Sequence, residues 1–305
     1  MSQLRGLVVP LVTPFDSQGR INTAALQSVA DHALRHGASG LMLTALTGEG
    51  NLLSANETET VWKTVIPRHR DRVPVVPAIF STTTAEAIRM GNLAADLGAS
   101  AVMISAIMPE LYGRRAQNHV RRFFETFCAA VPLPVVLFNY PSLAGYDLTP
   151  DLVAELTAID GVRYIKESTS DSRRVSEIVS RTKNGIQVIC GSPDVALESL
   201  ALGCKTWITA IMNIVPSACR ALIDTVERGN LAAARELNFR VIRPAFELIR
   251  RSSNTIGTIK AGLLLRNLDV GVPRRPGLPL EPDAAFRSDF EQLFRAEREL
   301  TGMSY

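Results

Sequence analysis

Residues 162–182 read VRYIKESTSDSRRVSEIVSRT and hold one strand signal followed by one helix signal. The run 162–165 is mostly apolar and suited to a buried strand, and 173–182 has the spacing of an amphipathic helix. Lys166 closes the strand-like run. An amine at such a place is desolvated, which lowers its pKa and frees it to attack a carbonyl group. On the local pattern alone, the alternative is a solvated lysine at a strand end.

The same strand and helix pattern recurs along the chain. Eight short apolar runs are expected to be strands: 6–12, 40–44, 75–79, 101–105, 135–138, 162–165, 187–190 and 206–210. Helical patterns lie between them at 23–36, 56–69, 84–97, 116–130, 149–159, 173–182 and 194–202. Because these strands are continuously apolar rather than alternating, they are typical of a parallel sheet covered by helices. Eight such units predict a closed (β/α)₈ TIM barrel, an α/β fold.

Glycine follows three of the expected helices, at Gly37, Gly98 and Gly203, where a helix needs a left-handed residue before the next strand. After residue 216 the strand signals stop. Helices are then expected at 218–228, 231–250 and 258–268, followed by a proline-rich turn at 273–282 and a last helix. The sequence therefore predicts a barrel over 1–216 and a C-terminal helical region over 217–305.

The expected barrel gives Lys166 a functional position. Active sites of such barrels lie at the C-terminal ends of the strands, and Lys166 is at that end of the sixth expected strand. With a period of two, Val162, Tyr164 and Lys166 share one face. If that face is the interior, the lysine points into the mouth of the barrel.

The composition of the 305-residue chain excludes several classes of protein. At 46% hydrophobic and 21% charged residues, the chain is globular rather than disordered. Its +3 charge comes with scattered arginines rather than one basic stripe, which argues against nucleic-acid binding. The four cysteines lack CxxC spacing and do not cluster with the four histidines as zinc ligands would. With neither a membrane-length apolar run nor an export signal, a reducing cytoplasm is expected.

Six short motifs stand in order at the expected strand ends. They are Val12-Thr13-Pro14-Phe15, Leu46-Thr47-Gly48-Glu49, Leu137-Phe138-Asn139-Tyr140-Pro141, Ile165-Lys166-Glu167-Ser168, Cys190-Gly191-Ser192-Pro193-Asp194 and Trp207-Ile208-Thr209-Ala210. In their order and spacing, the chain resembles the dihydrodipicolinate synthase and N-acetylneuraminate lyase superfamily of class I pyruvate aldolases. The resemblance extends from near the start of the chain to near its end and marks a divergent member.

The resemblance implies that Lys166 forms an imine with a 2-oxo acid such as pyruvate, and that the iminium then acts as an electron sink. It also implies that Thr47 and the backbone N–H groups near it receive the substrate carboxylate. Gly48 in that loop lets the backbone approach an anion closely, and Glu49 is interpreted as a loop-organising carboxylate. No metal or organic cofactor is expected. The remaining expected substrate-binding residues are Leu46, Phe138 and Ile208.

The chain departs from the family in its proton relay. Phe138 stands where the family has a tyrosine that shuttles protons, and a phenyl ring cannot exchange a proton. Leu46 replaces the first of two loop hydroxyls, and residues 106–109 occupy the place of a tyrosine pair, with Tyr112 the nearest tyrosine. If the fifth strand extends far enough, Tyr140 shares the face of Phe138 and is a candidate catalytic replacement. Packing in the loop wall is the alternative.

Substrate specificity can be read from the loop that follows the fifth strand. Synthases of the family commonly carry an arginine there for the second substrate's carboxylate, whereas this chain has Leu143. This favours aldol cleavage of a hydroxylated 2-oxo (sugar) acid to pyruvate and an aldehyde. Dehydration of a 2-keto-3-deoxy sugar acid and a dihydrodipicolinate synthase-like condensation are the alternatives within the family. A catalytically impaired homologue that keeps the barrel and the lysine but only binds 2-oxo acids is the alternative from another functional class.

The family resemblance also implies a homotetramer built as a dimer of dimers. The apolar segment 102–112 is the expected subunit contact, with internal packing as the alternative. Partners other than a small 2-oxo acid and further copies of the chain, such as a nucleic acid or a membrane, are not expected.

Overall fold

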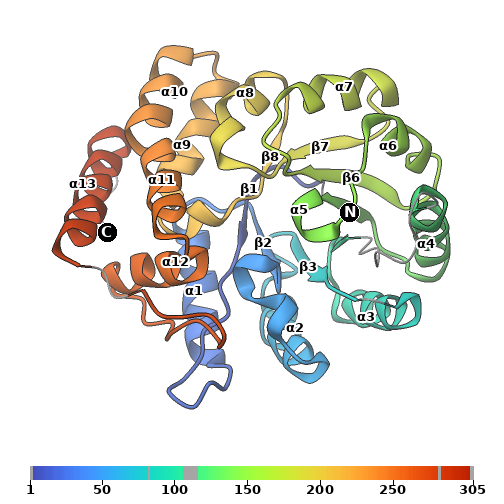
Figure 1. Cartoon of the computed structure of the whole chain (residues 1–305), viewed down its shortest axis with the longest axis horizontal. Helices are drawn as coiled ribbons and strands as arrows, with labels where there is room; N and C mark the ends of the chain where they lie inside the picture. Colours follow the sequence, from blue (N-terminus) through green and yellow to red (C-terminus); the bar gives the residue numbers. More distant parts are fainter. Residues whose placement is uncertain (1–2, 82, 106–115, 281–282, 303–305) are drawn as a thin grey trace. The chain divides into compact units, whose positions relative to one another are not determined.

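The closed barrel predicted from the sequence is confirmed. The structure, a computed structural model, describes residues 3–81, 83–105, 116–280 and 283–302. Its eight strands form a closed barrel in chain order from β1 to β8, which can be followed by colour in Figure 1. The segment 106–115 lies outside the described residues. The predictions for 106–109 and Tyr112, and most of the expected subunit contact, therefore fall outside them too.

Two compact units make up the chain and are described separately. The first unit comprises Met1–Leu4 and Ile66–Ile208, and the second comprises Arg5–Val65 and Thr209–Tyr305. The domain boundary expected after residue 216 remains a prediction.

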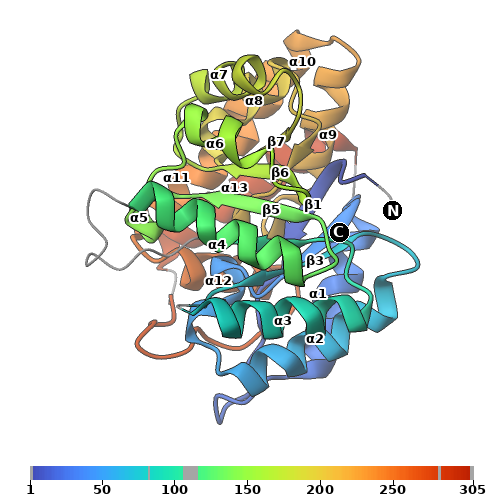
Figure 2. The ribbon, with the colours of Figure 1, turned by 90° about the vertical axis from the view of Figure 1, so that its right-hand side faces the viewer.

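The first unit contains six strands and the helices that follow them. The strands are β3 (Val75–Ile79), β4 (Val102–Ile104), β5 (Val135–Asn139), β6 (Val162–Glu167), β7 (Gln187–Cys190) and β8 (Thr206–Trp207). Successive strands pair in parallel. The helices are α3 (Thr84–Leu97), α4 (Ala116–Ala130), α5 (Pro141–Ala144), α6 (Pro150–Leu156), α7 (Arg173–Thr182) and α8 (Ala196–Ala201). Helices α6 and α7 lie side by side in Figures 1 and 2.

The register of β5 and β6 places the two key side chains of this unit opposite each other. Phe138 of β5 pairs with Lys166 of β6, and Glu167 pairs with Cys190 of β7. Strand β6 continues through Lys166 to Glu167, so the lysine belongs to the strand instead of following it. The strand therefore fixes the direction of the lysine side chain.

The second unit contains two strands and most of the C-terminal helices. Strands β1 (Gly6–Pro10) and β2 (Gly40–Leu43) are parallel. The helices are α1 (Thr23–Arg35), α2 (Ala55–His69, which continues into the first unit), α9 (Pro216–Glu227), α10 (Leu231–Leu237), α11 (Arg243–Ser252), α12 (Thr255–Leu265) and α13 (Ala284–Thr301). Figure 1 shows α9, α10, α11 and α13 as neighbouring ribbons, coloured orange to red.

Two expected elements are corrected by the structure. The helix expected over 231–250 is divided into α10, a π-helical turn (Asn238–Ile242) and α11. Pro244 explains the break, because a proline has no N–H for the helical ladder and its ring clashes with the preceding turn. The strand expected over 206–210 ends at Trp207, and a 3₁₀ helix (Ala210–Asn213) follows. The Asn213 amide donates to the Ala210 and Pro10 carbonyls and thus stabilises this turn.

The expected glycine caps are confirmed by their backbone angles. Gly37, Gly98 and Gly203 have φ values of 92°, 88° and 105°, in the left-handed region that favours glycine. None of the helices within the described ranges combines the length and apolarity that a membrane span requires.

A buried ion pair joins three C-terminal helices of the second unit. Arg266, at the end of α12, pairs with Glu297 of α13, and their side chains are 3% and 0% exposed. Glu297 also accepts a hydrogen bond from the Ala218 N–H of α9 at 3.0 Å. The Arg266 guanidinium lies 4.0 Å from the centroid of the Phe294 ring. The charges of Arg266 and Glu297 thus compensate each other where α9, α12 and α13 meet.

Removing one partner should reveal the cost of this burial. Arg266→Met leaves the Glu297 carboxylate unpaired, so the free energy of unfolding should fall by about 3 to 5 kcal/mol. Urea denaturation followed by circular dichroism measures the change. The exposed pair Arg250–Glu247 provides the control, and Arg250→Met should cost less than about 1 kcal/mol. Equal losses in the two variants would contradict the prediction.

Candidate active site

Lys166 is a desolvated amine held against an aromatic ring. Its Nζ lies 4.4 Å from the centroid of the Phe138 ring, its direct neighbour across the β5–β6 register. Burial lowers the pKa of Lys166 to about 8, and nearby Cys190 opposes this shift. Burial also raises the pKa of the Cys190 thiol to about 12. The site therefore has an amine that is partly neutral near physiological pH beside a neutral thiol.

Phe138 and Tyr140 are close to each other but belong to different elements. Phe138 is a buried residue of β5, and Tyr140 lies one residue beyond the strand, where it precedes α5. The strand thus stops short of the extension that would place both on one strand face. Their ring centroids are nevertheless 6.0 Å apart, with planes at 30°. Of these two neighbouring aromatic side chains, only Tyr140 carries a hydroxyl group.

Gly191 allows the chain after β7 to approach the lysine strand closely. Its N–H donates to the Glu167 carbonyl at 2.8 Å. A Cβ at this position would collide with Ser168 Oγ and lie 2.7 Å from the Glu167 carbonyl oxygen. Within the described residues, the buried hydroxyl oxygens of Ser168 and Thr169 have no hydrogen-bond partner. Two unsatisfied hydroxyl groups thus lie directly after Lys166-Glu167 in the described part of the chain.

A buried polar network secures the ends of β5 and β6. The Asn139 side-chain amide donates to Glu167 Oε2 at 2.9 Å and to Asp147 Oδ1 at 3.1 Å. Asp147 also pairs with Arg174 of α7, and the Thr169 N–H donates to Glu167 Oε1 at 2.8 Å. No role for these side chains was predicted from the sequence. The available signal was two polar residues, Asn139 and Glu167, at the ends of adjacent apolar strands.

Ile208 lies directly after β8 and is fully buried. Its N–H donates to the Cys190 carbonyl at 2.9 Å, so it continues the pairing of β8 with β7 beyond the strand itself. This places Ile208 at the same strand ends as Cys190.

In the second unit, the expected carboxylate-binding loop is a tight 3₁₀ turn (Leu46–Gly48) in which Thr47 is buried. The N–H groups of Gly48, Glu49 and Gly50 already donate to the carbonyls of Ala45 and Leu46. These three N–H groups are therefore satisfied within the turn. The donors that remain are Thr47 Oγ1 and the backbone N–H groups of Leu46 and Thr47.

The turn is supported by polar contacts on both sides. Thr13 Oγ1 donates to the Gly48 carbonyl at 2.6 Å. Glu49 has a left-handed backbone (φ 56°), and its carboxylate accepts from the Arg274 N–H at 2.7 Å and pairs with Lys260 at 2.9 Å. These contacts agree with the interpretation of Glu49 as a loop-organising carboxylate, which stays a prediction. Lys260 was missed, although a single lysine in the apolar helix TIGTIKAGLLL was a usable signal.

The proline-rich segment is attached to α2 by the Arg274 guanidinium. This group makes two bonds to the Glu57 carboxylate, at 2.7 and 2.8 Å. Hydrogen bonding from Arg274 lowers the pKa of Glu57 to about 2. The pair brings the Arg274 backbone N–H to the position where Glu49 accepts it.

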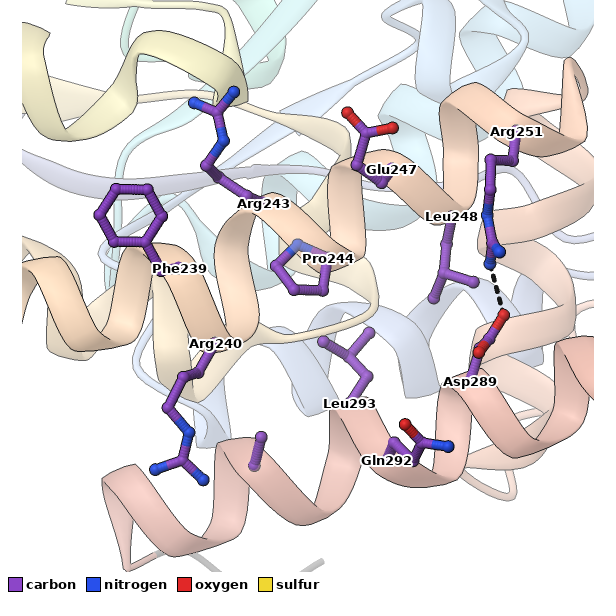
Figure 3. A pocket seen from close by; sticks show the side chains of 11 residues that line it. Phe239, Arg240, Arg243, Pro244, Glu247, Leu248, Arg251, Asp289, Gln292 and Leu293 are labelled. Atoms are coloured by element: carbon purple, nitrogen blue, oxygen red, sulfur yellow. Dashed lines mark hydrogen bonds and ion pairs between the residues drawn. The ribbon is translucent and has the colours of Figure 1, made fainter.

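A surface groove of about 770 Å³ lies elsewhere in the second unit, between α11 and α13. Figure 3 shows Pro244, Leu248 and Leu293 between the two helices, with the Arg251–Asp289 ion pair across one end. Arg240 is compensated by Glu236 and Glu299. This groove contains none of the predicted site residues. Within the described ranges, no group of three His, Cys, Asp or Glu side chains could hold a metal ion.

Comparison with known proteins decides the family. A model of the Dihydrodipicolinate synthetase family matches residues 3–293. The chain belongs to this family. A 4-hydroxy-tetrahydrodipicolinate synthase of Saccharophagus degradans is 30% identical over 296 residues, covering 96% of this chain and 98% of the relative. One from an Exiguobacterium species is 29% identical over 279 residues, covering 92% and 94%.

Solved structures of the family have the same fold. A Pseudomonas aeruginosa structure is 29% identical, with a TM-score of 0.90 over 96% of this chain and all of the other. The dihydrodipicolinate synthase of Acinetobacter baumannii, solved with pyruvate, is 25% identical, with a TM-score of 0.87 over 97% and 99%. The superfamily recognised from the six motifs is thereby confirmed, and the chain is an enzyme of the dihydrodipicolinate synthetase lyase and synthase type.

The lowered pKa of Lys166 predicts a pH dependence. Only the neutral amine attacks a carbonyl, and a pKa of about 8 leaves about one amine in ten neutral at pH 7. The initial rate of borohydride trapping with subsaturating pyruvate should therefore rise about tenfold per pH unit below pH 8 and level off above it. A rate that rises through the ordinary lysine value of 10.5 would contradict the prediction.

Proposed function

We propose that the protein is a class I lyase that forms a Schiff base between Lys166 and a pyruvate-type 2-oxo acid. The observation that carries the proposal is the desolvated amine of Lys166, with a pKa of about 8, in a strand of this family's barrel. Such an amine attacks the 2-oxo carbon, and loss of water gives an iminium. The pyruvate complex of the Acinetobacter baumannii relative supports pyruvate as the ligand.

Cleavage of a hydroxylated 2-oxo (sugar) acid is the reaction that we propose. The iminium accepts the electron pair of the breaking carbon–carbon bond and becomes an enamine, while the substrate hydroxyl loses its proton and leaves as part of an aldehyde. Protonation of the enamine and hydrolysis release pyruvate and restore Lys166. Leucine in place of an arginine at position 143 supports a hydroxylated substrate rather than a second carboxylate, and so do the hydroxyls of Ser168 and Thr169, which have no hydrogen-bond partner among the described residues.

The carboxylate-binding group in this proposal is the turn that holds Thr47, as the family resemblance implies. Thr47 Oγ1 and the amides of Leu46 and Thr47 receive the carboxylate, with Gly48 allowing the tight turn. Phe138 and Ile208 provide apolar walls. Lys166 needs neither a metal nor an organic cofactor for this chemistry.

Condensation of the 4-hydroxy-tetrahydrodipicolinate synthase type is the second candidate. The relatives at 29 to 30% identity that carry this name favour it. It would use the same imine with a different electrophile. Dehydration of a 2-keto-3-deoxy sugar acid is the third candidate, and binding of 2-oxo acids without turnover is the fourth. A turnover screen across 2-oxo acids separates all four.

Intact-mass analysis after borohydride reduction with pyruvate tests the imine. The wild-type protein should gain one reduced pyruvyl group, and Lys166→Ala should gain none. Lys205→Ala, which removes an exposed lysine near β8, should still be modified. Trapping in the wild type and cleavage that Lys166→Ala abolishes would exclude a binding protein. An unmodified wild type at high pyruvate would refute the imine, and condensation without sugar-acid cleavage would refute the proposed substrate class.

Tyr140 is proposed as the replacement for the missing strand-five hydroxyl. If Tyr140 transfers a proton, Tyr140→Phe should lower turnover about a hundredfold or more and leave pyruvate trapping intact, because imine formation precedes cleavage. Tyr146→Phe, on the other side of α5, provides the control and should retain full turnover. Unchanged turnover in Tyr140→Phe would assign this side chain to packing alone.

A homotetramer and a cytoplasmic location complete the proposal. Both follow from the family resemblance and from the composition rather than from a contact in the structure. Sedimentation at micromolar concentration tests the assembly.

A further inference from the structure

Lys260 is a buried charge that the proposed reaction does not use. It is the one charged residue of α12 (Thr255–Leu265), and its side chain is 2% exposed. Burial of an ammonium group is costly unless it is paired and hydrogen-bonded. Its place in an otherwise apolar helix therefore requires a local reason.

The surroundings of Lys260 satisfy its charge completely. Nζ lies 2.9 Å from Glu49 Oε1 and donates to the carbonyls of Thr13 and Val272, each at 3.0 Å. The ammonium thus donates two hydrogen bonds to backbone carbonyls and lies in ion-pair contact with one carboxylate oxygen. The same nitrogen lies 4.4 Å from the centroid of the Phe15 ring, a favourable position for a cation. Burial lowers the pKa of Lys260, and the Glu49 carboxylate opposes this shift.

These contacts meet both sides of the turn formed by Leu46–Gly48. Lys260 donates a hydrogen bond to the carbonyl of Thr13. The Thr13 hydroxyl in turn donates a hydrogen bond to the Gly48 carbonyl. Glu49, which Lys260 holds by its carboxylate, follows the turn directly in a backbone conformation that residues other than glycine rarely adopt. Lys260 therefore joins the two segments that determine the shape of the turn.

We propose that Lys260 is a positioning residue for the carboxylate-binding turn. By neutralising Glu49 and fixing Thr13, it holds the turn in its donor-presenting conformation before the 2-oxo acid arrives. Donors that are already in place need no reorganisation when the anion binds. The inference rests on the proposed role of Thr47, and it assigns Lys260 an effect on affinity for the 2-oxo acid rather than on the amine of Lys166.

A purely structural ion pair is the alternative, and the second unit contains a matched control. Arg266 and Glu297 form an ion pair that is as deeply buried, at 3% and 0% exposure, and that contacts Ile214, Ala218 and Phe294. Loss of either pair removes a buried counter-charge. Only loss of the Lys260–Glu49 pair should alter the binding of a carboxylate.

The test is a dose–response of borohydride trapping with pyruvate, read by intact mass, for Lys260→Met, Glu49→Gln and Arg266→Met. Lys260→Met and Glu49→Gln should each raise the half-saturating pyruvate concentration about tenfold or more. This is the change in affinity expected when one hydrogen bond to a charged group is lost. Their maximal trapped fraction and the pH at which trapping levels off should stay those of the wild type. Arg266→Met should lose stability without a change in half-saturation.

A half-saturating concentration in Glu49→Gln equal to that of the wild type would overturn the inference, as would an equal rise in Arg266→Met. Amide hydrogen exchange gives a second measurement that needs no catalysis. In the wild type without pyruvate, the amides of Gly48, Glu49 and Gly50 should be protected, and Glu49→Gln should lose that protection. Fast exchange in the wild type, or full protection in Glu49→Gln, would refute the positioning role. If pyruvate and borohydride do not modify the wild-type protein, the proposed function is refuted instead. The amide exchange measurement would then still test the positioning role of Lys260.

Discussion

Burying an amine in apolar surroundings lowers its pKa, and the presence or absence of a carboxylate then decides what the amine can do. Two lysines of this protein show both outcomes. Lys260 and Lys166 each rest 4.4 Å from the centre of a phenylalanine ring. Lys260 also meets the Glu49 carboxylate, which opposes the lowering of its pKa by burial, and its contacts hold a turn. Among the described residues, Lys166 has no carboxylate partner, and its pKa falls to about 8. The same desolvation thus leaves one lysine as a structural cation and makes the other a candidate nucleophile.

The backbone around Lys166 is arranged to keep that amine in one place. The β5–β6 register holds Phe138 opposite the lysine, and Asn139 joins the ends of both strands through Glu167 and Asp147. Gly191 lets the next strand end approach without displacing Ser168. Because a phenyl ring attracts a cation but cannot carry a proton, Phe138 suits a cationic iminium and leaves proton transfer to another group.

Enzymes that share an imine differ in what surrounds it. The family includes relatives named as synthases, and in the proposed chemistry condensation and cleavage would pass through the same enamine in opposite directions. The choice between them therefore depends on groups that contact the rest of the substrate rather than on Lys166. For the proposed reaction, the features that bear on this choice are leucine at position 143 of the sequence in place of an arginine and, among the described residues, the hydroxyls of Ser168 and Thr169, which have no hydrogen-bond partner.

Local sequence determined most of the secondary structure, because apolar periodicity and glycine caps act over a few residues. The eight strands, the caps at Gly98 and Gly203, and Lys166 near the end of β6 could all be predicted in this way. The π-helical turn before Pro244 and the early end of β8 could not, since the backbone there depends on hydrogen bonds made after packing. Only the tertiary structure paired Lys260 with Glu49 and brought the Arg274 N–H to that carboxylate from 225 residues away. The docking of α12 and of the proline-rich segment against the turn makes these contacts, and no periodicity in the sequence encodes a distance of that kind.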